Sequence, residues 1–167
     1  TFDAGNVTTN TATANGAQYI SELNTVNIIG TDLNAGSGTI TLAGGTFFTQ
    51  PGGQDIVSPT VVASGATLGG TGRITGAVTV NGGGTITAGQ DTGDPNLTLT
   101  GGLTISGGGK YAVKLFGTGA TDISLLSVTG TTASFAAALL SLDPARVDAL
   151  GVDERVSKAF SGPVKPY

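Results

Sequence analysis

The sequence of 167 residues has no cysteine, histidine, methionine or tryptophan, and only 11% of its residues are charged. Without cysteine and histidine, the chain lacks the usual zinc ligands and the Ser-His and Cys-His pairs of nucleophilic catalysis. Its net charge of -4 and its isoelectric point near 4.4 argue against a nucleic-acid partner. No apolar run is long enough to span a bilayer, so no transmembrane segment is expected in this chain.

Glycine, by contrast, is abundant: 29 residues punctuate short segments in which aliphatic and polar residues alternate. Alternation with a period of two is typical of strands with one buried face, and glycine clusters indicate turns. Between residues 65 and 132 the alternation predicts a core-facing set: Ile74, Val78, Val80, Ile86, Leu97, Leu99, Leu103, Ile105, Val113 and Leu115. It also predicts a solvent-facing set: Thr79, Thr85, Thr87, Thr98, Thr100, Thr104 and Lys114.

Two all-β architectures accept many short strands with one buried face, an antiparallel sandwich and a β-solenoid. A sandwich needs tight two-residue turns, such as Asn81-Gly82, between strands of similar length. Here the strands are short, and glycine clusters of varied length separate them. A solenoid needs bends that keep the chain coiling in one direction, and glycine permits them because it adopts backbone angles that other residues avoid. The pattern therefore favours the solenoid.

Residues 65 to 81, with the sequence GATLGGTGRITGAVTVN, resemble the passenger-associated β-strand repeat of bacterial autotransporters and related surface proteins. The resemblance continues through TITAGQ (85–90), LTLTGGLTI (97–105), the segment 110–116 and TDISLLSVTGT (121–131), and more loosely covers GTITLAGG (38–45). It implies a right-handed parallel β-helix exposed outside the cell, in a stalk, an adhesin or a matrix component. It implies no catalytic residue.

Composition divides the chain into a polar N-terminal arm (1–17), a solenoid body (18–132) and a C-terminal segment (133–167). Residues 1–132 hold 27 of the 29 glycines, whereas residues 133–167 hold two glycines and eight charged residues. Asp143, Pro144 and Gly151 predict a short helix in the last segment, because they suit an N-cap, a first turn and a helix end. Residues 133–142 (ASFAAALLSL) are compatible with either a strand or a helix.

The ends of a solenoid expose unpaired strands and an apolar cross-section, which a terminal segment or another subunit must cover. We expect Tyr19 or Ile20 to cover the first end, and the C-terminal segment either to cap the coil or to dock onto a neighbour. The residues predicted to mediate self-association are apolar side chains of the two terminal regions: Phe2, Val7, Tyr19, Ile20, Phe135, Leu139, Leu140, Leu142, Val147, Leu150, Val156 and Phe160.

Two stretches rich in glycine and proline, Gln50 to Pro59 and Gln90 to Asn96, are predicted to project from the coil as loops. In an adhesin these loops, or a groove along the side of the coil, would contact a surface glycan. Asp91 and Asp94 form an acidic pair in the second loop, which suits weak calcium binding or, more simply, turn formation.

The sequence favours a structural protein over an enzyme. Some parallel β-helices act on polysaccharides with Asp and basic residues, but the only cations of the body are Arg73, Lys110 and Lys114. We therefore expect no catalytic site, cofactor or metal. Absence of cysteine together with few charges suits an extracellular or cell-surface bacterial product. The expected function is a structural protein that self-associates, end to end, into a homo-oligomer, filament or surface matrix; the alternative is an adhesin or glycan-binding passenger fragment.

Overall fold

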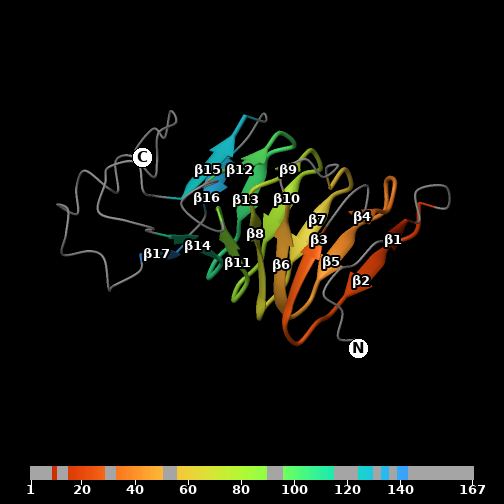
Figure 1. Ribbon diagram of the computed structural model, residues 1–167, viewed down its shortest axis with the longest axis horizontal. Helices are drawn as coiled ribbons and strands as arrows, with labels where there is room; N and C mark the ends of the chain where they lie inside the picture. The colour runs from red at the N-terminus through yellow and green to blue at the C-terminus, as the bar shows by residue number, and fades with distance from the viewer. Residues whose placement is uncertain are drawn as a thin grey trace.

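The computed structural model describes residues 9–10, 15–28, 33–50, 56–89, 96–114, 124–129, 133–135 and 139–142. Within these ranges all named elements are β-strands, and they wind as a β-solenoid (Figure 1). Every pair of neighbouring strands is parallel, which excludes the antiparallel sandwich. The all-β class and the parallel β-helix predicted from the sequence are therefore confirmed.

Two long sheets and a shorter wall surround the core. Sheet 1 contains β2 (Gln18–Ile20), β5 (Ile40–Leu42), β7 (Thr60–Val62), β10 (Val78–Val80), β13 (Leu103–Ile105) and β16 (Ala133–Phe135). Sheet 2 contains β3 (Thr25–Ile28), β6 (Gly45–Thr49), β8 (Ala66–Gly70), β11 (Thr85–Thr87), β14 (Lys110–Val113) and β17 (Leu139–Leu142). Sheet 3 contains β9 (Arg73–Ile74), β12 (Asn96–Leu99) and β15 (Leu125–Val128), and a separate pair joins β1 (Thr9–Asn10) to β4 (Leu33–Asn34).

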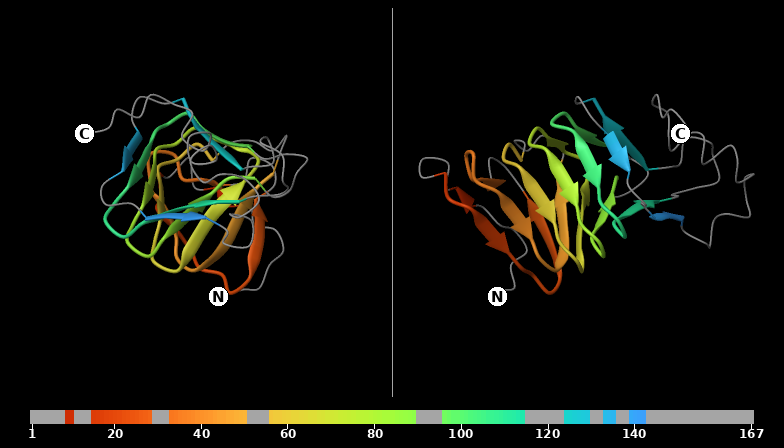
Figure 2. Two further views of the ribbon diagram at one scale, coloured as in Figure 1. Left: turned by 90° about the vertical axis from the view of Figure 1, so that its left-hand side faces the viewer. Right: turned by 180° about the vertical axis from the view of Figure 1, so that it is seen from behind.

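Figure 2 shows the hand of the coil. In its right-hand view the strands of sheet 1 face the viewer and run downward, while the chain advances from the N-terminal side on the left to the C-terminal side on the right. This path is a right-handed helix, which is also the hand that the family resemblance implies. Crossover connections between parallel strands have this hand in nearly all proteins.

The alternation of inward and outward residues builds one continuous core. In β10, Val78 and Val80 are buried, whereas Thr79 between them is half-buried on the outside. Every predicted core-facing residue that the structure describes is buried: Ile74, Val78, Val80, Ile86, Leu97, Leu99, Leu103, Ile105 and Val113. Leu115 lies outside the described residues. Burying an aliphatic side chain contributes about 1.5–3 kcal/mol, so these stacked files supply most of the stabilisation.

Glycines form the corner between sheet 1 and sheet 2. Gly65, Gly83 and Gly108 each adopt a φ of +81°, a backbone conformation that residues with a side chain disfavour. The N–H of Gly65 donates to the carbonyl of Gly83 at 3.0 Å, and the N–H of Gly83 donates to the carbonyl of Gly108 at 2.9 Å. The glycine clusters that the sequence indicates as turns thus stack into a hydrogen-bonded file along the coil.

Successive coils differ in length. The positions that stack in sheet 1 are Gln18, Ile40, Thr60, Val78, Leu103 and Ala133. The spacing is 18 residues between Thr60 and Val78 and 30 residues between Leu103 and Ala133. Much of the difference arises between sheet 2 and sheet 3, where two residues separate β8 from β9 and eight residues separate β11 from β12. This corner therefore accepts insertions that the glycine corner does not.

The solenoid extends past both boundaries that composition predicts. Thr9–Asn10, within the predicted arm, form β1 and pair with β4. Beyond residue 132, β16 pairs with β13 and β17 pairs with β14, so residues from the ambiguous stretch 133–142 form strands. A strand satisfies the backbone hydrogen-bonding groups of the preceding coil, which a helix at this place would not. The helix predicted from Asp143 to Gly151 lies outside the described residues.

Thr87 is not on the solvent face that the alternation predicts, because it is only 3% exposed. Its neighbour in sheet 2 is Gly69, which has no side chain. A Cβ atom added to Gly69 would lie 2.6 Å from Cγ2 of Thr87 and 3.0 Å from Cε1 of Phe48. The side chains of Thr87 and Phe48 therefore close over Gly69, and Thr87 is buried on the outside of the coil rather than in its core.

Candidate functional site

The first coil carries the most exposed apolar side chains of the described chain. Leu23 is 81% exposed in the bend between β2 and β3, and Tyr19 is 75% exposed in the middle of β2. Val57, which lies between Ile56 and β7 two coils further on, is 47% exposed. Two large apolar side chains near one end of a solenoid indicate a surface for contact with another molecule.

Ile20, which the sequence predicts for the same contact, points into the core instead. It is 6% exposed and belongs to the apolar cluster that contains Val26. Glu22 is also buried, and its carboxylate accepts a hydrogen bond from the N–H of Leu23 at 2.8 Å. Because the inward side chains of the first coil are already covered within the chain, a partner can reach only the outward ones.

The other end of the described coil consists of β16 and β17. The backbone register pairs Phe135 with Ile105, Leu140 with Tyr111 and Leu142 with Val113. The three partners in β13 and β14 are buried core residues. Leu139 pairs with Lys110 in the same register. The remaining residues predicted for self-association lie outside the described residues: Phe2, Val7, Val147, Leu150, Val156 and Phe160.

The two predicted loops start and end at the same corner of the coil. Gln50 follows β6, and Ile56 forms a bridge to β9, so the connection between them joins sheet 2 to the wall of sheet 3. Gly89 and Asn96 flank the second connection at the equivalent place. The end of the first predicted loop belongs to the coil itself, because Ile56 is a buried core residue and the carbonyl of Pro59 accepts the N–H of Ile40 at 2.9 Å.

Ser58, in the same stretch, is fully buried and binds two backbone groups of the preceding coil. Its Oγ accepts the N–H of Ala35 at 2.7 Å and donates to the carbonyl of Gly36 at 3.0 Å. Since both functions of the hydroxyl are used, Ser58 ties one coil to the next and is not available as a nucleophile.

A cluster on the outer face of sheet 2 joins residues from several coils. Lys114 follows β14, and its Nζ lies 4.7 Å from the centre of the Phe48 ring in β6, across the two intervening strands. The same Nζ donates to the carbonyl of Gly89 at 3.2 Å. Burial lowers the pKa of Lys114, because partial removal of the ammonium from water disfavours its charged form. The contacts with the Phe48 ring and the Gly89 carbonyl favour the charged form and act in the opposite direction. Sequence alone misses this cluster, because its members are neighbours only in the register of the coils.

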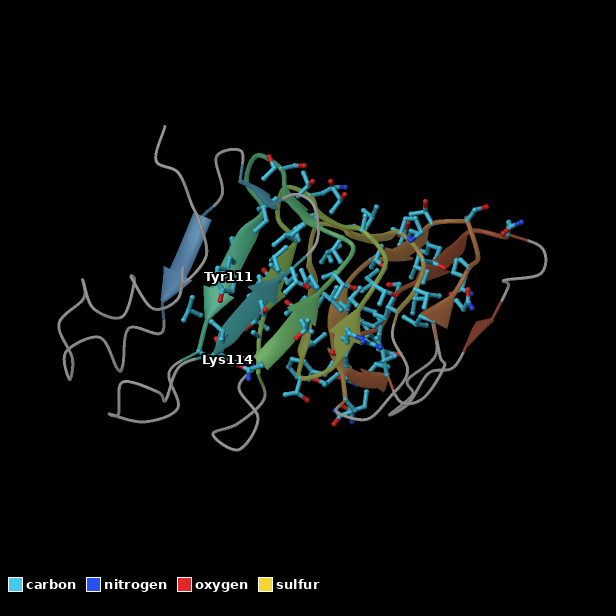
Figure 3. The ribbon with its side chains drawn as sticks, turned by 90° about the horizontal axis from the view of Figure 1, so that it is seen from above. Tyr111 and Lys114 are labelled. Carbon is cyan, nitrogen blue, oxygen red and sulfur yellow. The ribbon has the colours of Figure 1, made fainter. Side chains whose placement is uncertain are left out.

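Tyr111 lies in β14, the strand that precedes Lys114, but its side chain faces the core (Figure 3). It is 3% exposed, and burial raises its pKa to about 12, against the effect of a hydrogen bond with the backbone of Leu126. Lys114 is labelled beside it in Figure 3. Both shifts follow from packing between coils and need no ligand to explain them.

The described residues bring together no group of three or more Asp, Glu, His or Cys side chains that would hold a metal ion. Asp91 and Asp94 lie outside these residues, as does most of the second predicted loop. In the part of the chain that the structure covers, no helix is long and apolar enough to cross a membrane. The surface of the first coil and the outer faces of the sheets are therefore the candidate functional features.

Comparison with known proteins identifies no relative: no family model matches the sequence, and neither a curated protein nor a solved structure gives a significant match. The function is therefore argued from the surface of the coil itself.

Proposed function

We propose that this chain is an extracellular bacterial structural protein that associates end to end into a filament or surface matrix. The observation that carries the proposal is the exposure of Leu23 and Tyr19 on the first coil. Tyr19 lies within β2, and Leu23 lies in the bend between β2 and β3. Each of these strands is the last of its sheet in the described part of the chain. Exposed apolar side chains beside terminal strands favour contact with another strand-bearing partner.

A second copy of the chain offers strands of matching geometry. Sheets 1 and 2 end at β2 and β3 on one side and at β16 and β17 on the other. A head-to-tail contact would place β16 and β17 of one copy beside β2 and β3 of the next, which continues both parallel sheets. Backbone hydrogen bonds would supply affinity, and burial of Leu23 and Tyr19 would add to it. Because such a contact uses two different surfaces, it propagates unless rotation closes a ring.

The extracellular assignment is supported by the sequence. The chain contains no cysteine and few charges, and residues 65 to 131 resemble the repeat of bacterial autotransporter passengers. A solenoid with few charged side chains suits a stalk or matrix, because the function of a stalk or matrix requires length and packing rather than a reactive site.

Electron microscopy of the purified chain, together with its mass in solution over a range of concentrations, tests the proposal. We expect filaments with a constant axial repeat and a mass that grows with concentration. Leu23→Ser should raise the concentration for half-assembly about tenfold or more, because burying Leu contributes about 1.5–3 kcal/mol. Val57→Ser is the matched control, since Val57 is exposed but lies away from β2 and β3. A chain that stays monomeric at all concentrations would contradict the proposal.

The second candidate function, a glycan-binding adhesin, is favoured by the placement of the two predicted loops. Gln50 and Gly89 both leave sheet 2 at the corner with sheet 3, so both connections belong to one edge of the coil. Binding of a monomer to a glycan array, lost when residues 51–55 or 90–95 are replaced by Gly-Ser linkers, would support this function. Loss of binding on Leu23→Ser instead would argue against it.

A further inference from the structure

Sheet 1 presents an outer face of uncharged side chains, most of them small, which we call the neutral face. Its central file is stacked in register from β2 to β16 and consists of Tyr19, Thr41, Val61, Thr79, Thr104 and Ser134. Tyr19, on the terminal strand β2, is the one large side chain of this central file. Alanine, serine, threonine, proline and asparagine occupy most of the flanking outward positions, such as Ala43 and Asn81. In the right-hand view of Figure 2 this face points to the viewer, and no coloured segment crosses in front of it.

In the described part of the chain, the neutral face bears no charged side chain. Arg73 belongs to sheet 3, Lys110 and Lys114 belong to sheet 2 and its end, and Glu22 is buried. Because the whole chain has a net charge of -4, copies repel one another on average. A face without charge is the place where two copies can approach with the smallest electrostatic cost.

We propose that the neutral face packs against the neutral face of a second copy, so that filaments associate side by side. Two sheets pack face to face at a separation of about 10 Å, which small side chains such as Ala, Thr and Val allow. Threonine and valine also have few rotamers to lose on contact. This inference deepens the proposed function and rests on it, since the lateral contact joins filaments into a matrix.

The area of the neutral face sets the strength of the contact. Six strands spaced by about 4.8 Å, with an outward width of about five residues, give a face of roughly 400 Å². A stable pair of proteins buries about 800 Å² on each partner, so two single copies should pair only weakly. In a filament the faces of successive copies add, and pairing becomes strong through multivalency. Lateral association should therefore follow end-to-end association rather than precede it.

Cysteine cross-linking tests the contact between neutral faces. Because the natural chain has no cysteine, only the introduced thiols can form disulfides. The variants Val61→Cys and Thr79→Cys place single thiols near the middle of the neutral face, and Thr67→Cys places one at a matched half-buried position on sheet 2. Each variant, and an equimolar mixture of the first two, is oxidised mildly, both as assembled material and as free chain at millimolar concentration. Disulfide-linked pairs are then counted by non-reducing electrophoresis.

We expect the neutral-face variants to form linked pairs at least several-fold faster than Thr67→Cys. Pairs within one variant would indicate parallel copies, and mixed pairs would indicate antiparallel copies; both support the inference. Equal rates for all three variants would overturn it, as would protection of the two thiols by a soluble glycan, since the face would then bind sugar.

The outcome also separates this inference from the proposed function. Faster cross-linking of the free chain at millimolar concentration, without any filament in the microscope, would uphold the neutral-face contact and reject end-to-end association. Filaments that do not bundle and show no preference for cross-linking at Val61 and Thr79 would uphold the proposed function and reject the neutral-face contact.

Discussion

The outer faces of sheet 1 and sheet 2 are built on the same coils, yet they differ in how their side chains interact. On sheet 2, Lys114 reaches back across two strands to Phe48, and Thr87 is buried beside Gly69. On sheet 1, Thr79 and its neighbours form a flat file of small side chains. Specific residues are thus needed at some outward positions of sheet 2, such as Gly69, as well as at inward positions and corners. Outward residues of sheet 2 hold coils together, whereas those of sheet 1 are the ones for which we propose a contact with a second copy.

The largest expected effect concerns the apolar core that sheet 1 and sheet 2 share. Leu42 in sheet 1 and Leu68 in sheet 2 are both fully buried in the core. Leu42→Ala and Leu68→Ala should each lower the free energy of unfolding by about 2–5 kcal/mol, because a cavity is left in a packed core. Urea unfolding followed by circular dichroism measures the loss. A much smaller loss for one of the two variants would show that sheet 1 and sheet 2 do not contribute equally to the stability of the core.

The dependence of stability on alkaline pH should distinguish sheet 2 from sheet 1. Tyr111, in sheet 2, has a pKa raised to about 12, whereas the inward residues described for sheet 1 include no titratable side chain. The unfolded state loses the Tyr111 proton near pH 10 and the folded state keeps it to about pH 12, so this contribution to stability is present below pH 10 and lost between the two values.

The pKa difference corresponds to about 2–3 kcal/mol at full loss. Urea unfolding between pH 8 and 12 should therefore show a steeper fall for the natural chain than for Tyr111→Phe. Parallel curves for the two proteins would mean that Tyr111 is not buried in the way that the structure shows.

The smallest effect concerns the outward positions themselves. Gly69→Val should destabilise the chain by about 1–3 kcal/mol, because the added side chain meets Thr87 and Phe48. Thr79→Val, on sheet 1, should change stability by less than about 0.5 kcal/mol, since its neighbour in the file is already Val61. Thermal unfolding of both variants compares the two faces. Equal effects would remove the distinction between a face that joins coils and a face that is open to a partner.

Much of the fold could be predicted from the sequence. Inward residues such as Ile86 and Leu99 alternate with polar ones, and this local pattern predicts buried faces correctly because side-chain direction in a strand has a period of two. Gly65, Gly83 and Gly108 are readable as turns because positive φ angles favour glycine. The boundary at residue 132 is not readable, since β16 continues sheet 1 with residues that also suit a helix.

The candidate site was less predictable. Tyr19 and Ile20 are adjacent, and the sequence suggests both for self-association, but only the fold decides that Tyr19 is exposed and Ile20 is buried. The contact of Lys114 with Phe48 depends on four strands in register, whose spacing along the chain varies. No local pattern predicts which residues of different coils become neighbours.

The sequence by itself determined that the chain forms short one-sided strands joined by glycine turns, because both properties depend on a residue and its immediate neighbours. Only the tertiary structure decided which outward residues stack, because the coils differ in length from 18 to 30 residues and the register is set by pairing across them. The uncharged file of sheet 1 and the cross-coil contacts of sheet 2 are products of that register.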